Sequence, residues 1–155
     1  MSDDLVFRDA TFGDLPAIVG LLADDDLGRT RERLEDPLPE AYLAALQAIE
    51  ADPNNRLVVI ERGGRVGGCL QLTFIPNLTF QGGWRMQIEG VRIARPLRGQ
   101  GVGEAAFRWA IDEARGRGCR LVQLTTNAAR PDALRFYEKL GFVHSHAGLK
   151  LDLSE

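Results

Sequence analysis

The stretch LRGQGVGEAAF, Leu97 to Phe107, follows a strand-like run and opens a run of helical periodicity, so it constrains the fold most tightly. It places Arg98, Gly101 and Gly103 in an R-x-x-G-x-G pattern. The first amides of a helix lack partners within the helix and carry partial positive charge, so an anion placed there gains several N–H bonds. The residues alone leave open a phosphate-binding loop and a plain glycine-rich turn. The spacing excludes a Walker loop and a dinucleotide fingerprint.

Hydrophobic periodicity on both sides of this stretch alternates between strand-like and helical. Gly63-Gly64 predicts a tight hairpin, Gly90 a β-bulge, and Thr11 with Asp14 a capped helix start. We expect an α/β fold, a three-layer sandwich around a mixed sheet. The expected order is a strand (5–8), two helices (15–22 and 39–52), three strands (56–62, 65–75 and 84–93), a helix (102–117), a strand (120–126), a helix (132–140) and one or two closing strands (142–153).

Length and composition predict one soluble globular domain over residues 1–155, since 45% of the residues are apolar and 26% are charged. No run approaches a membrane span, and the acidic start MSDDL is unlike a signal peptide, so we expect a cytoplasmic protein without membrane contact. The net charge of −3, with both signs mixed, argues against a nucleic-acid partner.

The cysteines and histidines do not form a metal-ligand pattern. Cys69 and Cys119 lie in apolar strand-like runs without CxxC spacing and are expected to be reduced core thiols rather than a disulfide or metal site. His144 and His146 form an isolated HxH and are interpreted as surface or strand residues. We therefore expect no metal.

A second segment, ALRFYEKLGF (Ala133 to Phe142), follows the glycine-rich segment at the distance of one helix and one strand. With both segments, the chain resembles the GNAT superfamily of N-acetyltransferases over nearly its whole length. The resemblance implies a GNAT-like acyl-CoA N-acyltransferase fold with a splayed sheet and acetyl-CoA as the acetyl donor. It implies that the CoA pyrophosphate binds the segment Arg98, Gly99, Gln100, Gly101, Val102 and Gly103, and that the pantetheine arm pairs with Val91, Arg92 and Ile93.

Aminolysis of a thioester requires a neutral amine and the departure of a thiolate. Glu89, inside the apolar run IEGVRI, is the candidate base, acting through a water by resemblance; the alternative is an ordinary outward-facing strand carboxylate. Tyr137 occupies the position of the superfamily's tyrosine and is the candidate general acid, with a core tyrosine as the alternative. The superfamily often has Asn where this chain has Arg130, with Asn127 nearby, and neither is assigned a role.

The predicted function is acetyl-CoA-dependent N-acetylation of a primary amine on a small molecule or peptide, by direct attack on the thioester. A catalytically idle acyl-CoA-binding or sensing module and a longer-acyl transferase remain as alternatives. A homodimer is left open. The acceptor is expected against the first two helices, the loop 24–39 and the connection 74–84. The run Asp24-Asp25-Asp26 could attract a cationic amine, but solvated surface is the simpler interpretation.

Overall fold

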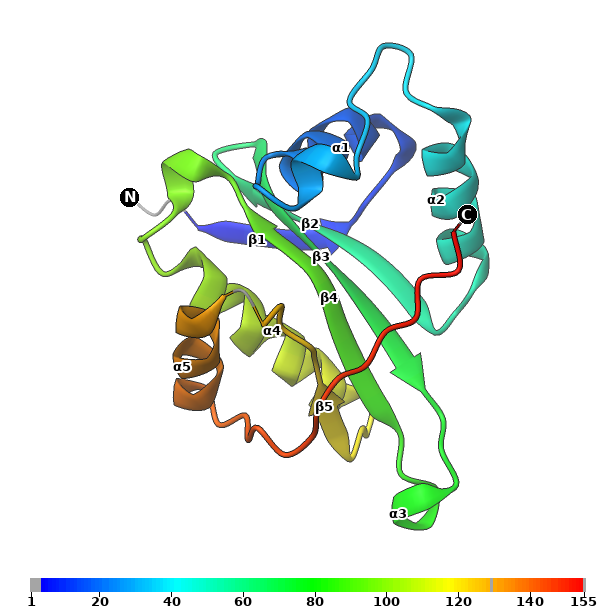
Figure 1. The fold of residues 1–155 in the computed structure, drawn as a ribbon, viewed down its shortest axis with the longest axis vertical. Helices are drawn as coiled ribbons and strands as arrows, with labels where there is room; N and C mark the ends of the chain where they lie inside the picture. Colours follow the sequence, from blue (N-terminus) through cyan, green and yellow to red (C-terminus); the bar gives the residue numbers. More distant parts are fainter. Residues whose placement is uncertain (1–3, 129, 155) are drawn as a thin grey trace. The chain divides into compact units, whose positions relative to one another are not determined.

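The computed structural model describes residues 4–128 and 130–154, which form two compact units, Met1–Gln123 and Leu124–Glu155. The described part of the first unit contains a five-stranded sheet in the order β1-β2-β3-β4-β5 (Figure 1). The first three pairings are antiparallel and the last is parallel, so the sheet is mixed, as predicted. The strands are β1 (Leu5–Asp9), β2 (Asn55–Arg62), β3 (Arg65–Ile75), β4 (Arg85–Ile93) and β5 (Leu121–Gln123).

Apart from the four-residue α3 (Thr79–Gly82), in a stretch expected to be a connection without a helix, the helices follow the order expected from the sequence. No helix of the described ranges is both long and apolar enough to cross a membrane. The α-helices of the first unit are α1 (Leu15–Ala23), α2 (Glu40–Ala51), α3 (Thr79–Gly82) and α4 (Val102–Gly116), and α5 (Pro131–Lys139) belongs to the second unit. Short 3-10 turns are η1 (Phe12–Asp14), η2 (Gly28–Thr30) and η3 (Arg95–Leu97).

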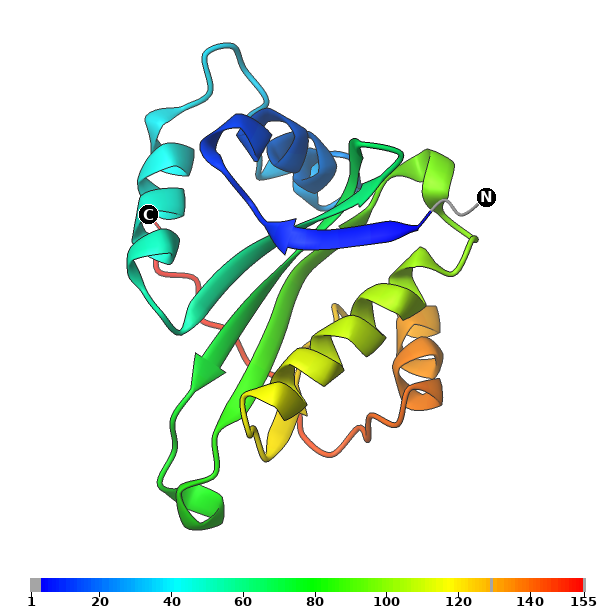
Figure 2. The same cartoon turned by 180° about the vertical axis from the view of Figure 1, so that it is seen from behind.

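Helices α1 and α4 cover opposite faces of the sheet. Ile18 of α1 packs in a buried cluster with Val59 of β2. Trp109 of α4 stacks on Phe7 of β1 at 4.8 Å between ring centroids, and Phe7 lies opposite Ile60. Because neighbouring strand residues such as Val59 and Ile60 point to opposite faces, the first unit has the predicted order of helix, sheet and helix (Figure 2).

The start of α1 is fixed by the predicted capping box and by an arginine from β1. The Asp14 carboxylate accepts the Thr11 backbone N–H and two hydrogen bonds from Arg8. Arg8 also donates to Glu61 of β2. Hydrogen bonding to Arg8 lowers the pKa of Asp14 to about 2, although its burial acts in the other direction. One ion cluster thus joins the start of α1 to two strands.

Strand β4 contains the predicted bulge. Gln71 of β3 lies opposite Glu89, and Cys69 lies opposite Arg92, so β4 advances three residues where β3 advances two. Gly90 has φ of 65°, in the left-handed region that favours glycine. The bulge therefore inserts one residue into β4 and reverses the alternation of its side chains.

Strand β5 covers only the first third of β4. Strand β5 pairs only with residues 85–87, although β4 continues to Ile93. Within the described sheet, the β5-side edge of residues 88–93 therefore has no partner strand. Strand β5 is also shorter than the predicted 120–126, since it ends at Gln123.

The predicted closing strands over 142–153 are wrong. Within the described ranges this segment forms neither helix nor strand, although Leu149, Leu151 and Leu153 alternate with charged residues. These leucines are 93%, 84% and 86% exposed. A period-two pattern produces a strand only where a neighbouring strand supplies hydrogen-bond partners, and this segment has none among the described residues.

We predict that Leu72→Ala lowers the free energy of unfolding by about 2 to 5 kcal/mol, because Leu72 is fully buried and the change leaves a cavity. Leu78→Ala is the matched control, since Leu78 is 96% exposed, and should change stability by less than about 0.5 kcal/mol. Urea unfolding of the three proteins measures both effects. Equal losses in the two variants would contradict the core assignment.

Candidate functional site

The predicted pyrophosphate loop links η3 to α4, and its backbone is shaped by glycine. Gly99 and Gly101 have φ of 75° and 79°, and Gly101 is the N-cap residue of α4. Among the described residues, no side chain caps this helix start, so its first amides remain available to a ligand. A Cβ added at either glycine would meet no protein atom within 4 Å. Glycine is therefore needed here for the left-handed backbone and not to avoid a neighbouring protein atom.

Side chains on both sides brace this loop. Arg98 Nε donates to the Ile93 carbonyl of β4 at 2.9 Å. Gln100 Nε2 donates to the Pro96 carbonyl at 2.7 Å, and Gln100 Oε1 accepts a bond from Arg62 of β2 at 2.9 Å. The loop is thus held to two strands. Arg62 could not be predicted from the sequence, because no local pattern links the end of β2 to a loop so far along the chain.

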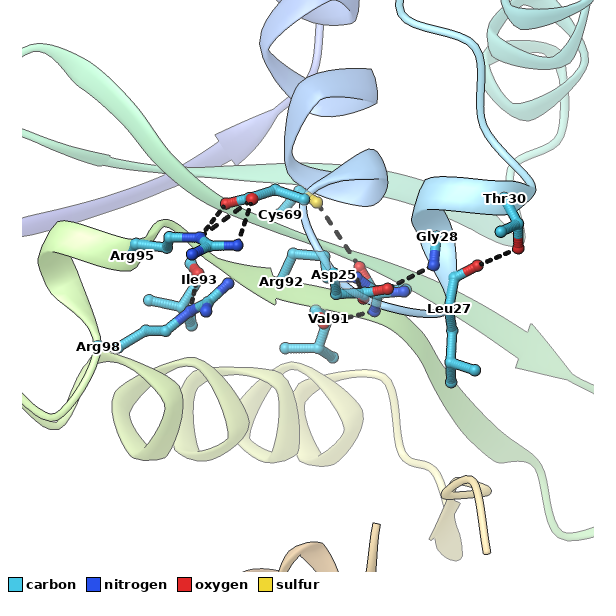
Figure 3. Close-up of polar contacts among 12 residues, drawn as sticks. Asp25, Leu27, Gly28, Thr30, Cys69, Val91, Arg92, Ile93, Arg95 and Arg98 are labelled. Atoms are coloured by element: carbon cyan, nitrogen blue, oxygen red, sulfur yellow. Dashed lines mark hydrogen bonds and ion pairs between the residues drawn. The ribbon is translucent and has the colours of Figure 1, made fainter. Parts of the chain in front are cut away.

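The end of β4 holds the three residues predicted to pair with pantetheine, and one of them forms an ion pair. Arg92 Nε lies 2.9 Å from Asp25 Oδ2, and both side chains are largely buried (Figure 3). Arg92 Nη1 also donates to the Val91 carbonyl at 2.9 Å. This pair joins the loop after α1 to the strand that carries Val91 and Ile93.

The other oxygen of Asp25 shapes the turn that follows α1. It accepts the backbone N–H of Gly28, which is buried at the start of η2. A Cβ on Gly28 would lie 1.8 Å from the Leu22 carbonyl oxygen, so the turn closes tightly against α1. Asp25 therefore fixes the shape of the turn and also its attachment to β4.

The acidic run 24–26 is thus not simply solvated surface, the interpretation favoured from the sequence. Asp24 pairs with Arg95 at 3.0 Å, and both side chains are well exposed. Asp26 is 97% exposed and lies 3.4 Å from Arg29. Of the three acids, only Asp25 is both paired and largely buried.

The structure places Glu89 on the face of the sheet that α1 covers. Its partner across the ladder is Gln71, which shares a face of β3 with the α1-packed Cys69. The Glu89 side chain is exposed and accepts a 2.9 Å bond from Gln87, which in turn accepts a 2.9 Å bond from Gln123 of β5. The Glu89 carboxylate therefore lies at the end of a row of hydrogen-bonded amides, where a ligand can reach it.

Cys69 lies next to this region but is not an activated thiol. Its sulfur is buried, lies 3.6 Å from the Gly90 carbonyl oxygen, and burial raises the pKa of the thiol to about 11. A thiol with so high a pKa is a poor nucleophile at neutral pH. His144 and His146 are exposed, in agreement with the surface interpretation.

Tyr137 belongs to α5 in the second unit, where its ring packs between two phenylalanines. The ring centroids of Phe136 and Phe142 lie 5.4 and 6.0 Å from that of Tyr137, both at an interplanar angle of 73°. The Tyr137 carbonyl accepts the Phe142 N–H at 3.1 Å. The segment Ala133 to Phe142 therefore forms a compact cluster of three aromatic rings. Arg130 is the N-cap residue of the same helix.

The first unit brings together Glu89, the 91–93 edge and the 98–103 loop, and the Arg98 bond to Ile93 connects the last two. Tyr137 belongs to the other unit. The signals that predicted these residues were local, namely glycine spacing and the two motifs. The signal for the row of amides, alternating polar residues on β3 and β4, was present but was not recognised.

Comparisons with known proteins give consistent results. The acetyltransferase (GNAT) family profile matches residues 22–142. An aminoalkylphosphonate N-acetyltransferase of Salmonella typhimurium is 32% identical over 140 residues, covering 90% of this chain and 85% of that protein. A glucosamine 6-phosphate N-acetyltransferase of Oryza sativa subsp. japonica is 36% identical over 115 residues, covering 72% and 68%. A crystal structure from Bacillus halodurans C-125, described as a transcriptional regulator, superposes with a TM-score of 0.94 at 54% identity, covering 97% and 100%.

We predict that Asp25→Asn lowers the free energy of unfolding by about 2 kcal/mol or more, because it leaves the largely buried Arg92 without its counter-charge. The amide oxygen still accepts the Gly28 N–H, so the change isolates the charge. Asp24→Asn is the control: its exposed pair with Arg95 should contribute no more than about 1 kcal/mol. Chemical denaturation at neutral pH compares the two, and equal effects would rule out a special role for the buried pair.

Proposed function

Since the chain belongs to the acetyltransferase (GNAT) family, we propose that it acetylates a primary amine on a small molecule or peptide by direct attack of the amine on the thioester of acetyl-CoA. The chain is an N-acetyltransferase of a family that uses acetyl-CoA. The observation that carries the proposal is the uncapped start of α4, preceded by two left-handed glycines and connected to the open edge of β4. The family match crosses the boundary between the two units, which supports their acting as one domain.

The cofactor is proposed to lie along this edge and loop. The pyrophosphate accepts bonds from the backbone amides of residues 98–103, where the helix dipole favours negative charge. Arg98 adds positive charge to the loop. The pantetheine amides pair with the backbone of Val91, Arg92 and Ile93, in the place of a further strand.

Glu89 and Tyr137 are proposed to carry the proton transfers. Glu89 accepts a proton from the attacking amine through a water, and its exposed carboxylate on the α1 face supports this role. Tyr137 donates to the departing thiolate. A phenol with a pKa of about 10 is a weaker acid than a thiol at about 8.5, so hydrogen-bond stabilisation of the thiolate is the larger part of its effect.

The relatives narrow the choice of acceptors for a first panel. Two of them are described as acting on an aminoalkylphosphonate and on glucosamine 6-phosphate, both small amines that carry a phosphorus oxyanion. A panel that tests the proposal contains such amines together with polyamines and peptides. Acetyl transfer is measured by the release of free CoA thiol. The Bacillus chain described as a transcriptional regulator supports acyl-CoA sensing as a second candidate. A longer acyl donor is tested in the same assay.

We predict that acetyl-CoA binds in an isothermal titration and that Gly101→Val weakens it about tenfold or more, because a branched Cβ obstructs the approach of the phosphate. Gly64→Val in the hairpin is the matched control. Gly64 has φ of 77° against 79° for Gly101, and neither Cβ would meet a neighbour within 4 Å. Both variants should lose about 1 to 2 kcal/mol of stability, but only the first should lose cofactor affinity. Absence of binding at millimolar CoA would contradict both the enzyme and the sensor.

We predict that Tyr137→Phe lowers kcat by about 10² to 10⁴ at saturating acetyl-CoA while cofactor affinity changes little, because it removes the hydroxyl and keeps the packed ring. Tyr42→Phe is the control, since that hydroxyl bonds Glu32 and the Arg33 backbone in the first unit. Steady-state rates with an accepted amine give the comparison. A loss below about threefold, with chemistry rate-limiting, would make Tyr137 a packing residue.

A further inference from the structure

The face of the sheet that carries Glu89 is apolar beneath α1 and becomes polar beyond it. Val59 of β2 and Cys69 of β3 pack against α1. Further along the same face, most ladder positions across β2, β3, β4 and β5 are polar. The exceptions are Leu57, opposite Gln71, and Ile75 and Leu121, on either side of Arg85. The polar sheet face consists of Asn55, Gln71, Thr73, Gln87, Glu89 and Gln123, in the register pairs Asn55–Thr73, Gln71–Glu89, Thr73–Gln87 and Gln87–Gln123.

These side chains form connected hydrogen-bonded rows. Besides the Gln123–Gln87–Glu89 row, Asn55 Oδ1 accepts bonds from Thr73 at 2.8 Å and Gln71 at 3.3 Å. The opposite face of the same strands is the buried core. A sheet face that presents mainly amides, a hydroxyl and a carboxylate is suited to a polar ligand rather than to a covering helix.

Arg85 lies on this same face, at the far end of β4 from the bulge. It is two residues before Gln87 and lies opposite Ile75 and Leu121, whose side chains flank it on the two neighbouring strands. Glu89 is four residues further on, about 13 Å along an extended strand. The two charged side chains lie on one face of β4, with Gln87 between them.

The Arg85 guanidinium is the unusual feature. Among the described residues, three arginines have a buried Nε without a hydrogen bond, namely Arg62, Arg85 and Arg92. Arg62 uses Nη1 to bond Gln100, and Arg92 forms its ion pair with Asp25. No residue of the described ranges accepts a hydrogen bond from Arg85 or forms an ion pair with it. A buried donor without an acceptor is costly, and a bidentate oxyanion is the ligand that a guanidinium fork matches.

We propose that the polar sheet face binds the body of the acceptor, that Arg85 binds an oxyanion at the end remote from the amine, and that Glu89 lies at the amine end. The acceptor class is thus a polar primary amine carrying a phosphate or phosphonate. This inference rests on the proposed acetyltransfer and adds to it the residue that selects the substrate. Arg85 is a specificity residue and takes no part in the chemical step.

The experiment uses two pairs of amines that differ only by a phosphate: ethanolamine with O-phosphoethanolamine, and glucosamine with glucosamine 6-phosphate. For the full chain with saturating acetyl-CoA, kcat/KM should favour the phosphorylated member of at least one pair by about tenfold to a hundredfold, the range of a charge-assisted hydrogen bond. Arg85→Gln should remove this preference by raising KM for the phosphorylated amine, with kcat/KM for the other member unchanged. Arg85→Lys should restore part of it.

Arg65→Gln is the matched control, because Arg65 is exposed at the start of β3 and should leave the preference intact. Equal kcat/KM for the members of both pairs in the parent protein, or a preference that survives in Arg85→Gln, would overturn the inference while the proposed function stands. Titration with N-acetylglucosamine 6-phosphate in the presence of CoA needs no turnover. The parent protein could bind this product and yet acetylate no amine. If Arg85→Gln then weakens the binding, the result would support the anion site and count against the proposed function.

Discussion

The residue inserted into β4 at the Gly90 bulge is the constraint on which the rest of the site depends. Along a regular strand, residues three apart point to opposite faces, so Glu89 and Arg92 would be separated by the sheet. The bulge brings both to the face covered by α1, as their ladder partners Gln71 and Cys69 show. Arg92 can therefore reach Asp25, and the loop after α1 is attached to the strand beside the candidate base.

The early end of β5 leaves an edge of β4 without a partner strand among the described residues. Backbone N–H and C=O groups on an unpaired strand edge require hydrogen-bond partners. Such an edge can therefore pair with an extended ligand. Residues 88–93 form this edge, and the chain continues from it through η3 into the uncapped start of α4. The Arg98 bond to the Ile93 carbonyl holds the junction. One continuous segment thus has an unpaired strand edge at one end and an uncapped helix start at the other.

The features that could be predicted from the sequence are those decided by local backbone chemistry. Gly63-Gly64, Gly90 and the Thr11 capping box all act within a few residues, and each was predicted correctly. The closing strands were wrong because a strand depends on a partner that a period-two pattern cannot supply. Pairings between distant residues, such as Asp25 with Arg92, depend on the face of the sheet to which each side chain points. The local sequence does not determine that face. In the sequence Arg85 is an ordinary strand residue. It is distinguished in the structure by a buried Nε together with the lack of any hydrogen-bond acceptor or ion-pair partner among the described residues.

The exposure of Glu89 also limits the chemistry that the first unit can support. A lysine-like amine with a pKa near 10.4 is almost fully protonated at pH 7, and reaching its neutral form costs about 4 to 5 kcal/mol, whereas an amine with a pKa near 7.7 requires only about 1 kcal/mol. An exposed carboxylate accepts a proton but does not desolvate the ammonium, so it removes little of the larger cost. If Glu89 is the base, as proposed, the arrangement therefore favours weakly basic amines. Binding energy from a remote oxyanion on Arg85 would then serve to hold such an amine in position for attack, where orientation is the larger part of the remaining barrier.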